Sequence, residues 1–368
     1  MKILILSCNT GEGHHSAALA LQEVLEEQQV SNEIIDPVSF AGDTASEKIC
    51  DIYNSMIQNN PKAFGFIYHM GEAYNQTFKH SPVYFANSLY VKKLLSYIQS
   101  NGFDAVICTH LYGMEAMTAI QKKLNVHIPS YGVLTDYTYI PFFSDTKLDG
   151  YFIPHSDLKQ DLIQKGFTDT MLSPTGIPTS KRFRNHISKE IARNLLMIPQ
   201  NKKIYLIMTG GVGCGNISAI CDGLLKNEMD DFVAYILAGK NHTLQENLNK
   251  IYQNDRRIQC VGFTHKVNEY MNAADVLITK PGGLSSTEAA VANIPLIHYI
   301  TIPGCETSNA IFFASHGMSW KTENPHEAAK LAVKLVHDEN AVQNMCQRQA
   351  SEINPHAAQE IIRKIIAK

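Results

Sequence analysis

Short apolar runs alternate with longer stretches of helical periodicity along the whole chain. Runs of this kind, bounded by polar turns, are typical of strands buried in a parallel sheet, and the stretches between them have the length of crossover helices. The pattern predicts an α/β protein with two doubly wound, Rossmann-like domains, because the runs fall into two series. The predicted strands cover residues 3–6, 33–36, 105–109, 131–135, 150–154 and 171–173, and then residues 204–209, 233–237, 258–263, 276–279 and 295–300.

A polar segment separates the two series of runs. It is charged and is interrupted by Pro174, Pro178 and Pro199, which disfavour continuous helix. We therefore expect a linker at about 178–200, with a first domain of residues 1–178 and a second domain of residues 200–345.

The chain ends in a further predicted helix within residues 346–368. Its apolar face consists of Ile361, Ile362, Ile365 and Ile366. Such a face must pack against a core, but the pattern alone does not say which domain supplies it.

Composition narrows the class of protein. The chain has 368 residues, 45% of them hydrophobic, and a net charge of −3, so it can bury two cores and has no bulk charge that favours a nucleic-acid partner. We expect a cytoplasmic protein, because the N-terminus lacks a signal peptide and no apolar run reaches the roughly 18 residues of a membrane span. The eight cysteines show no paired spacing, which predicts reduced thiols and no metal site.

The first predicted strand runs into a glycine-rich loop followed by two histidines. From Cys8 to Leu25 the sequence reads CNTGEGHHSAALALQEVL. Gly13 and the glycine two residues earlier let the backbone approach a ligand closely, and the next helix points unpaired N–H groups at the same place. This arrangement suits an anion such as a diphosphate, and His14 and His15 add side chains capable of acid–base chemistry.

A second glycine-rich loop follows the strand at 204–209. Gly210, Gly211 and Gly213 stand between this strand and a helix predicted to begin near Asn216. The loop lacks the Lys-Ser/Thr ending of an ATP-hydrolysing phosphate loop, and its glycine spacing is not the dinucleotide fingerprint. A tight turn from strand to helix explains it as well as a ligand does.

A third loop, after the strand at 276–279, carries more information. Gly282 and Gly283 precede hydroxyl side chains, including Ser285 and Thr287, that could bind phosphate together with backbone N–H groups. Glu288 would repel a phosphate but suits the hydroxyls of a ribose. The structural alternative is a capping box between Ser285 and Glu288, which have the spacing of that motif.

Residues 61–100 form an unusual segment. Nine of these 40 residues are aromatic, and the only acidic residue is Glu72. A basic, aromatic and partly helical segment suits docking on an anionic membrane surface, whereas the alternative is a helical insertion whose aromatic rings fill the core. The lysines expected to bind the membrane are Lys62, Lys79, Lys92 and Lys93.

Several motifs occur together in a characteristic order. They are GEGHHSAA, LTDY at 134–137, TGIP, GFTHKVNEYM at 262–271, TKPGGLSSTEA and PGCETSNA at 303–310. In this order and spacing the chain resembles, over nearly its whole length, the diacylglycerol glycosyltransferases, which include bacterial processive glucosyltransferases and plant monogalactosyldiacylglycerol synthases.

The resemblance implies a GT-B fold with the active site in the cleft between the domains. The second domain would bind a UDP-sugar as co-substrate without a metal or other cofactor, the first domain a lipid acceptor, and the final helix would cross back onto the first domain. The residues implied to bind the donor are Phe263 and Thr264 at the uracil, Gly211 and Gly283 at the phosphates, Glu288 at the ribose, and Glu306 and Asn309 at the hexose.

By motif, His14 corresponds to the histidine of the family's Gly-x-Gly-His loop. As a neutral imidazole it could remove the proton of the acceptor hydroxyl during inverting transfer, hold the diphosphate, or orient the acceptor. The structural alternative is a loop or cap residue. Asp136 ends a predicted strand at the ligand-binding edge of the sheet, where it could orient His14 or hold the acceptor, or could simply start a turn.

Two departures from the family pattern leave the substrates open. Ile140 and Phe143 stand where many relatives have a histidine and then a tryptophan, and Cys305 stands where relatives often have glutamine. The sequence therefore predicts an inverting transferase that moves glucose or galactose from UDP to diacylglycerol or a related lipid at the inner face of the cell membrane. The alternatives are a UDP-N-acetylglucosamine 2-epimerase and a non-catalytic UDP-sugar sensor.

Overall fold

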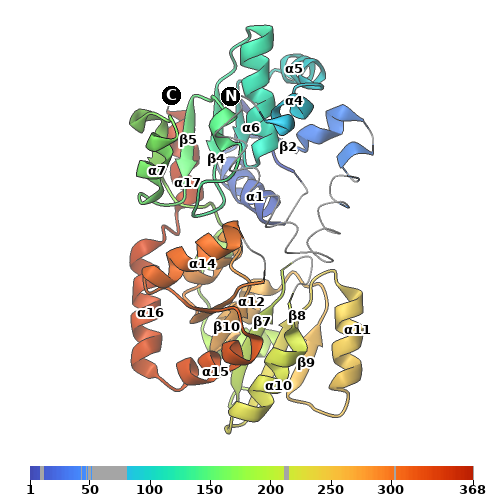
Figure 1. Ribbon diagram of the computed structural model, residues 1–368, viewed down its shortest axis with the longest axis vertical. Helices are drawn as coiled ribbons and strands as arrows, with labels where there is room; N and C mark the ends of the chain where they lie inside the picture. Colours follow the sequence, from blue (N-terminus) through green and yellow to red (C-terminus); the bar gives the residue numbers. More distant parts are fainter. Residues whose placement is uncertain are drawn as a thin grey trace. The chain divides into compact units, whose positions relative to one another are not determined.

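The computed structural model describes residues 1–8, 12–42, 44–46, 48, 51, 81–210, 215–301 and 304–367. The described chain forms two compact units, one of Met1–Ser180 with Asn354–Lys368 and the other of Lys181–Ile353 (Figure 1). The predictions for Lys62, Lys79, Gly211 and Gly213 lie outside the described residues.

The first unit is built on a parallel sheet of six strands in the order β2-β1-β3-β4-β5-β6. Side chains of β1 alternate between two cores: Leu4 and Leu6 belong to one, and Ile3 and Ile5 to the other. All four are fully buried, so both faces of the sheet are covered, as a continuous apolar run predicts. The strands are β1 (Lys2–Leu6), β2 (Ser31–Ile35), β3 (Ala105–Cys108), β4 (Ser130–Val133), β5 (Gly150–Ile153) and β6 (Leu172–Pro174).

Helices cover both faces of this sheet. One face packs against α4 (Pro82–Asn87), α5 (Val91–Ser100), α6 (Leu111–Ala119) and α7 (Leu158–Gln164), and the other against α1 (Glu12–Glu27) and α17 (Ala357–Ile366). Ile361, Ile362 and Ile365 of α17 share a core with α1, which confirms that the last helix returns to the first unit. Ile366 was wrongly assigned to this apolar face: it is 39% exposed, and Ala358 packs in the core instead.

The second unit has its own parallel sheet of six strands, in the order β12-β11-β10-β7-β8-β9. Its strands are β7 (Lys203–Met208), β8 (Phe232–Leu237), β9 (Ile258–Val261), β10 (Val276–Thr279), β11 (Leu296–Tyr299) and β12 (Trp320–Thr322). Its helices include α10 (Ile217–Asn227), α11 (His242–Ile251), α12 (Val267–Ala273), α13 (Gly283–Val291), α14 (Cys305–Ser315), α15 (Pro325–Val336) and α16 (Glu339–Glu352).

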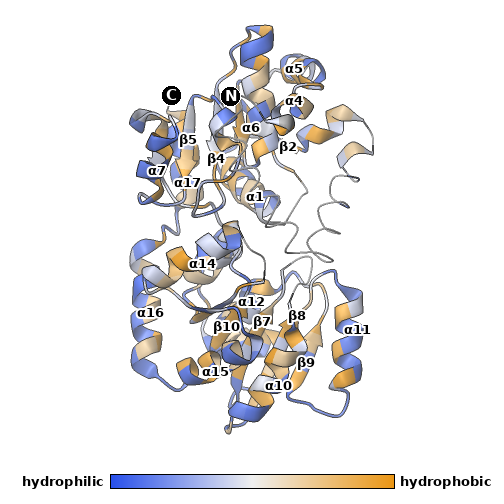
Figure 2. Ribbon diagram, viewed as in Figure 1, coloured by the Kyte–Doolittle hydropathy of each residue, from blue (hydrophilic) through white to orange (hydrophobic). Residues whose placement is uncertain are grey.

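The two sheets confirm the predicted α/β class with two doubly wound domains. Each predicted apolar run coincides with a strand, and among the strands of the described residues only the short edge strand β12 was not predicted. Hydrophobic residues concentrate on the strands, whereas helices such as α11 and α16 carry hydrophilic residues along their length (Figure 2). In the described part of the chain, no helix is both long and apolar enough to cross a bilayer.

The segment expected to be a linker, residues 178–200, contains two helices of the second unit. They are α8 (Lys181–Arg184) and α9 (Lys189–Leu196), and they follow directly after the first unit ends at Ser180. The chain then crosses once more, after Ile353.

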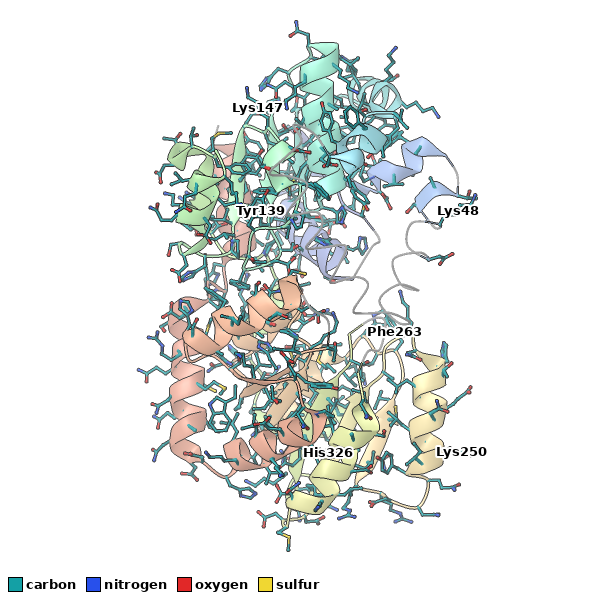
Figure 3. All side chains as sticks on the ribbon, viewed as in Figure 1. Lys48, Tyr139, Lys147, Lys250, Phe263 and His326 are labelled. Carbon is teal, nitrogen blue, oxygen red and sulfur yellow. The ribbon has the colours of Figure 1, made fainter. Side chains whose placement is uncertain are left out.

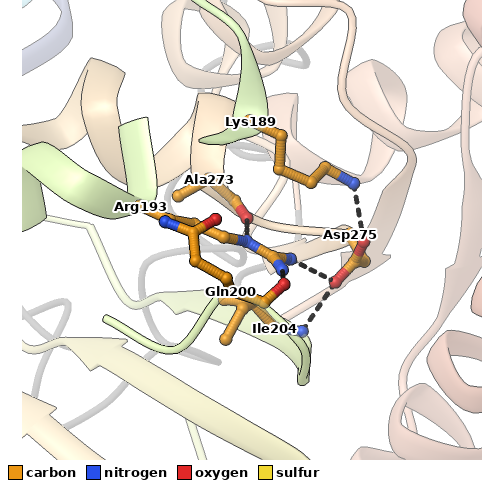
Figure 4. A network of polar contacts seen from close by, with 6 residues as sticks. All are labelled: Lys189, Arg193, Gln200, Ile204, Ala273 and Asp275. Carbon is orange, nitrogen blue, oxygen red and sulfur yellow. Dashed lines mark hydrogen bonds and ion pairs between the residues drawn. The ribbon is translucent and has the colours of Figure 1, made fainter. Parts of the chain in front are cut away.

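A buried arginine fixes α9 to the sheet of the second unit (Figure 4). Arg193 is 5% exposed and donates hydrogen bonds to the carbonyl oxygens of Ala273 and Gln200 and to the carboxylate of Asp275. Asp275 also accepts a hydrogen bond from the backbone N–H of Ile204, at the beginning of β7. Each of the three guanidinium nitrogens of Arg193 therefore donates a hydrogen bond. These bonds explain why the polar, charged segment that contains α9 packs as part of the second unit.

Candidate functional site

Helix α1 presents His14 to the carboxyl ends of two neighbouring strands. Its Nδ1 lies 2.9 Å from the carbonyl oxygen of Thr109, just after β3, and 2.9 Å from Oγ1 of Thr135, just after β4. A carbonyl oxygen only accepts hydrogen bonds, so Nδ1 carries the proton and Thr135 accepts as well. In the neutral ring Nε2 then has a lone pair, which is the atom a general base needs.

The surroundings of His14 favour the neutral form. Burial lowers its pKa below 6.5, and the nearby negative charge of Asp136 opposes that effect. Asp136 is half-buried and follows Thr135 directly, so the structure puts both predicted catalytic residues at the same sheet edge. Their chemical roles stay predictions.

A second histidine, His110, lies beside the first and was not predicted. Its ring stands edge-on to that of His14, with centroids 4.5 Å apart and ring planes at 89°. His110 caps helix α6 by accepting a hydrogen bond from the backbone N–H of Tyr112, at 3.2 Å. Burial and the neighbouring His14 lower the pKa of His110 well below its usual value, so it is neutral near pH 7. The rule that ligands bind at strand carboxyl ends would have found His110, because it follows the apolar run at 105–109.

In the second unit, helix α13 begins with an open N-terminus. Its N-cap is Gly282, which offers no side chain to the first backbone N–H groups, and Gly283 is the first helical residue. The capping-box alternative is therefore wrong: Ser285 is the third residue inside the helix and Glu288 lies a full turn further on. An uncapped helix N-terminus after a strand suits an anion, as the loop sequence predicted.

The hydroxyl side chains of this helix differ in what they can reach. Ser285 is half-buried, whereas Thr287 is fully buried and donates a hydrogen bond to the carbonyl oxygen of Gly283 at 2.7 Å. The predicted contact of Thr287 with a donor would have to compete with this bond. Buried Ser286 contacts Nε2 of His298 at 2.9 Å, inside the core.

Residues predicted to contact the ribose and hexose lie on α13 and α14. Glu288 is half-buried, and desolvation raises the pKa of its carboxyl to about 7 although Arg182 opposes this. Arg182, on α8, was not predicted. Glu306 is the second residue of α14 and is 6% exposed. Asn309, one turn on, donates to the carbonyl oxygen of Pro281 at 3.1 Å, which ties α14 to the loop before α13.

The two residues predicted at the uracil lie in the loop after β9. The ring of Phe263 is 56% exposed, with Nζ of Lys240 5.8 Å from its centroid (Figure 3). Thr264 accepts a hydrogen bond from the backbone N–H of Lys266 at 3.1 Å, which holds the turn. An exposed aromatic face on an ordered turn can stack on a flat base.

The two departures from the family pattern near LTDY have different surroundings. Phe143 is fully buried and stacks on Phe167 with centroids 4.8 Å apart, so it belongs to the core of the first unit. Ile140 is half-buried at the edge of that core.

Two doubly wound parallel sheets of six strands each, with candidate ligand groups at the carboxyl edges of their strands, form the GT-B fold. The family model for Monogalactosyldiacylglycerol (MGDG) synthase matches residues 14–179, and the model for the Glycosyltransferase family 28 C-terminal domain matches residues 217–365. The two matches lie side by side along the chain, and together they confirm the resemblance of its motifs to the diacylglycerol glycosyltransferases.

Individual proteins are similar to this chain, one in sequence and two in fold. A processive diacylglycerol beta-glucosyltransferase of Bacillus pumilus is 27% identical over 99% of this chain and 94% of its own length. The crystal structure of MurG of Acinetobacter baumannii has the same fold, with a TM-score of 0.67 and 15% identity over 100% of this chain and 99% of that one. A putative UDP-N-acetylglucosamine 2-epimerase of Listeria monocytogenes is also similar in fold, with a TM-score of 0.64 and 13% identity over 98% and 94% of the two chains.

Proposed function

We propose that this enzyme transfers a hexose from UDP-glucose or UDP-galactose to diacylglycerol, with inversion, at an anionic membrane surface. The main support for the proposal is the position of Nδ1 of His14, which donates a hydrogen bond to the carbonyl oxygen of Thr109. This bond keeps the proton on Nδ1, so that Nε2 is unprotonated and able to accept a proton. The family assignment and the relative from Bacillus pumilus support the choice of a lipid acceptor.

The proposed reaction is a single displacement. The acceptor hydroxyl oxygen attacks the anomeric carbon while its proton passes to Nε2 of His14. The bond between the anomeric carbon and the β-phosphate oxygen breaks, and its electron pair leaves with UDP. A positioned general base of this kind contributes a rate factor of roughly 10² to 10⁴.

The donor would lie along the ligand edge of the second unit. Phe263 and Thr264 would hold the uracil, Glu288 the ribose hydroxyls, and Glu306 with Asn309 the hexose. Gly210 and the N-terminus of α13, with Ser285, would face the phosphates. The phosphate contact predicted for Gly13, in the first unit, stays a prediction from its loop sequence. Support comes from the uncapped Gly282 and from the low exposure of Glu306, since a buried carboxylate discriminates between hydroxyl configurations.

A surface of the first unit supports membrane association. Phe85 and Leu89 are 55% and 85% exposed, around the turn that joins α4 and α5. Lys123 donates to Oγ of Ser88 at 2.6 Å in this turn, and Lys122 lies 5.7 Å from the ring of Tyr84. The sequence holds no acidic residue from 81 to 101. We call this the Leu89 surface, and it consists of Phe85, Leu89, Lys92, Lys93, Lys122 and Lys123.

The aromatic residues in the described part of the segment 61–100 support both interpretations made from the sequence, membrane docking and filling of the core. Tyr84 and Tyr90 are buried in the core of the first unit, whereas Phe85 is exposed. The segment therefore fills the core with some rings and leaves apolar and cationic side chains outside, the combination that anchors peripheral proteins at an anionic interface.

The test is transfer from labelled UDP-hexoses to diacylglycerol in mixed micelles that contain anionic lipid, with products separated by chromatography. We expect a glycolipid from one donor and its loss in His14→Ala, with His15→Ala as the matched control on the same helix. No glycolipid from any donor, together with conversion of UDP-N-acetylglucosamine to its 2-epimer, would contradict the proposal in favour of the epimerase. Binding of UDP-sugar without any turnover would favour a sensor.

A further inference from the structure

Lys280 and Glu306 form an ion pair at the ligand edge of the second unit. Lys280 follows β10 directly, and its Nζ lies 2.5 Å from Oε1 of Glu306 on α14. The side chains are 23% and 8% exposed. The second carboxylate oxygen, Oε2, is buried and has no hydrogen-bond partner among the described residues. An unpaired acceptor of this kind costs free energy unless a ligand satisfies it.

The aliphatic part of Lys280 lies against Gly210, in the loop that follows β7. A Cβ added at Gly210 would stand only 2.4 Å from Cε of Lys280, and the residue has φ of +72°. The positive φ favours glycine at this position, and a Cβ here would displace the end of the Lys280 side chain.

The ammonium group also lies close to the open end of α13. A Cβ added at Gly282, the N-cap, would be 3.9 Å from Nζ of Lys280. The same small region thus contains a lysine, a helix N-terminus without a side-chain cap, and a buried carboxylate with one unpaired oxygen. The first two attract an anion, and the third accepts a hydroxyl.

Building on the proposed function, we propose that Lys280 binds the diphosphate of the donor and competes for this purpose with its own partner, Glu306. In the protein without donor, Nζ neutralises the carboxylate. When the donor binds, Nζ of Lys280 forms an ion pair with the diphosphate instead. The carboxylate of Glu306 then accepts hydrogen bonds from the hydroxyls of the hexose. The pair therefore couples recognition of the sugar to recognition of the phosphates.

This arrangement predicts opposite effects for the two partners. Lys280→Gln removes the cation and lowers the affinity for UDP at least tenfold, while the affinity for uridine, which lacks phosphate, stays within twofold. Glu306→Gln removes the competing carboxylate and raises the affinity for UDP. Because the hexose loses the charged acceptor and meets a neutral amide instead, the same variant lowers the ratio of UDP-glucose to UDP affinity.

The experiment is calorimetric titration of UDP, UMP and uridine into the full chain and its variants. Lys280→Arg should retain most of the UDP affinity, and Lys226→Gln, an exposed lysine in the last turn of α10, is the matched control. The double variant Lys280→Gln with Glu306→Gln leaves no unpaired buried charge, so its low UDP affinity would reflect the lost cation rather than misfolding.

Two results would overturn the inference. Equal UDP affinity in Lys280→Gln and the original chain would remove Lys280 from the donor site, and an equal loss for UDP and uridine would give it a purely structural role. A folded original chain that binds none of the three ligands would reject the proposed function itself, and this outcome is distinguishable from the first two.

Discussion

The carbonyl oxygen of Thr109 lies 2.9 Å from Nδ1 of His14, and this contact decides which nitrogen of the imidazole carries the proton. Because the oxygen comes from the backbone at the end of β3, no substitution of Thr109 removes it. Of the two contacts of Nδ1 that the described residues show, the one with the hydroxyl of Thr135, also at 2.9 Å, can be deleted by a side-chain change.

Thr135→Val should lower kcat about fivefold, while Thr135→Ser should stay near the original rate. The valine removes one acceptor from Nδ1 and leaves the Thr109 carbonyl, so the ring keeps its tautomer but loses part of its orientation, at a cost of about 1 kcal/mol. Single-turnover rates with saturating donor measure this effect. A loss as large as that of His14→Ala would mean that the hydroxyl itself touches substrate.

The pH dependence of transfer should report His14. Burial lowers its folded pKa below 6.5, so the part of the kcat/KM profile that reports His14 should rise with pH, reach half its maximum below pH 6.5 and level off above that pH. In Asp136→Asn the charge that raises this pKa is gone, so the half-maximum should move to lower pH. Profiles from pH 4.5 to 8 test both statements, and a movement to higher pH in Asp136→Asn would contradict the electrostatic role of Asp136.

Buried His298 should make the stability of the folded protein sensitive to acid. His298 is fully buried between the hydroxyls of Ser286 and Ser319, and desolvation lowers its pKa to about 3. The unfolded chain takes up its proton near pH 6.5, so the stabilisation is complete above that pH and is lost as the pH falls toward 3. The free energy of unfolding should fall by up to about 1.4 kcal/mol per pH unit from this residue.

Urea unfolding of the original chain and of His298→Gln between pH 7 and pH 5 measures this contribution. The variant should be less stable at pH 7 but should lose stability more slowly as the pH falls. Parallel curves would show that His298 can be protonated in the folded state without cost.

Removing Arg193 should destabilise the second unit by about 3 kcal/mol, since Arg193→Met takes away a buried guanidinium that donates to Asp275 and to the carbonyl oxygens of Ala273 and Gln200. Asp275 then keeps only Lys189 and the backbone N–H of Ile204 among its described donors. Lys189 contacts the same carboxylate but is 48% exposed, so Lys189→Met should cost at most about 1 kcal/mol. Chemical denaturation of the two variants tests this difference. Similar losses for both would mean that the guanidinium contributes no more than a surface charge.

The strands were predictable because a strand buried on both faces must be apolar along its whole length, as Ile3, Leu4, Ile5 and Leu6 of β1 are. The strand β12 was not predicted because it has three residues and a lysine, Lys321, in the middle, so it forms no apolar run. Helix α9 was taken as part of a linker because its main buried anchor is a charged residue, Arg193.

The candidate site was predictable where several residues of a motif act together, as around His14 and Gly283. Three single residues were missed: His110 and Lys280, which follow the ends of β3 and β10, and Arg182, which lies on α8. Their roles depend on contacts between segments far apart in sequence: Lys280 with Glu306, and His110 with His14. A spacing within one segment carries no information about such contacts.

Membrane binding should depend on the Leu89 surface. Neutralising Lys92, Lys93, Lys122 and Lys123 to glutamine should weaken binding to vesicles with anionic lipid by at least tenfold, since each lysine near such a surface contributes about 1 kcal/mol. Leu89→Ser should weaken binding to neutral and anionic vesicles alike, because it removes an apolar contact, whereas the loss from the lysine changes should disappear at high salt. Co-sedimentation measures both, with Lys250→Gln and Lys321→Gln, two exposed lysines of the second unit, as the control. If the control lost as much binding as the lysine variants of the first unit, attraction would come from overall charge, and the Leu89 surface would have no special part in it.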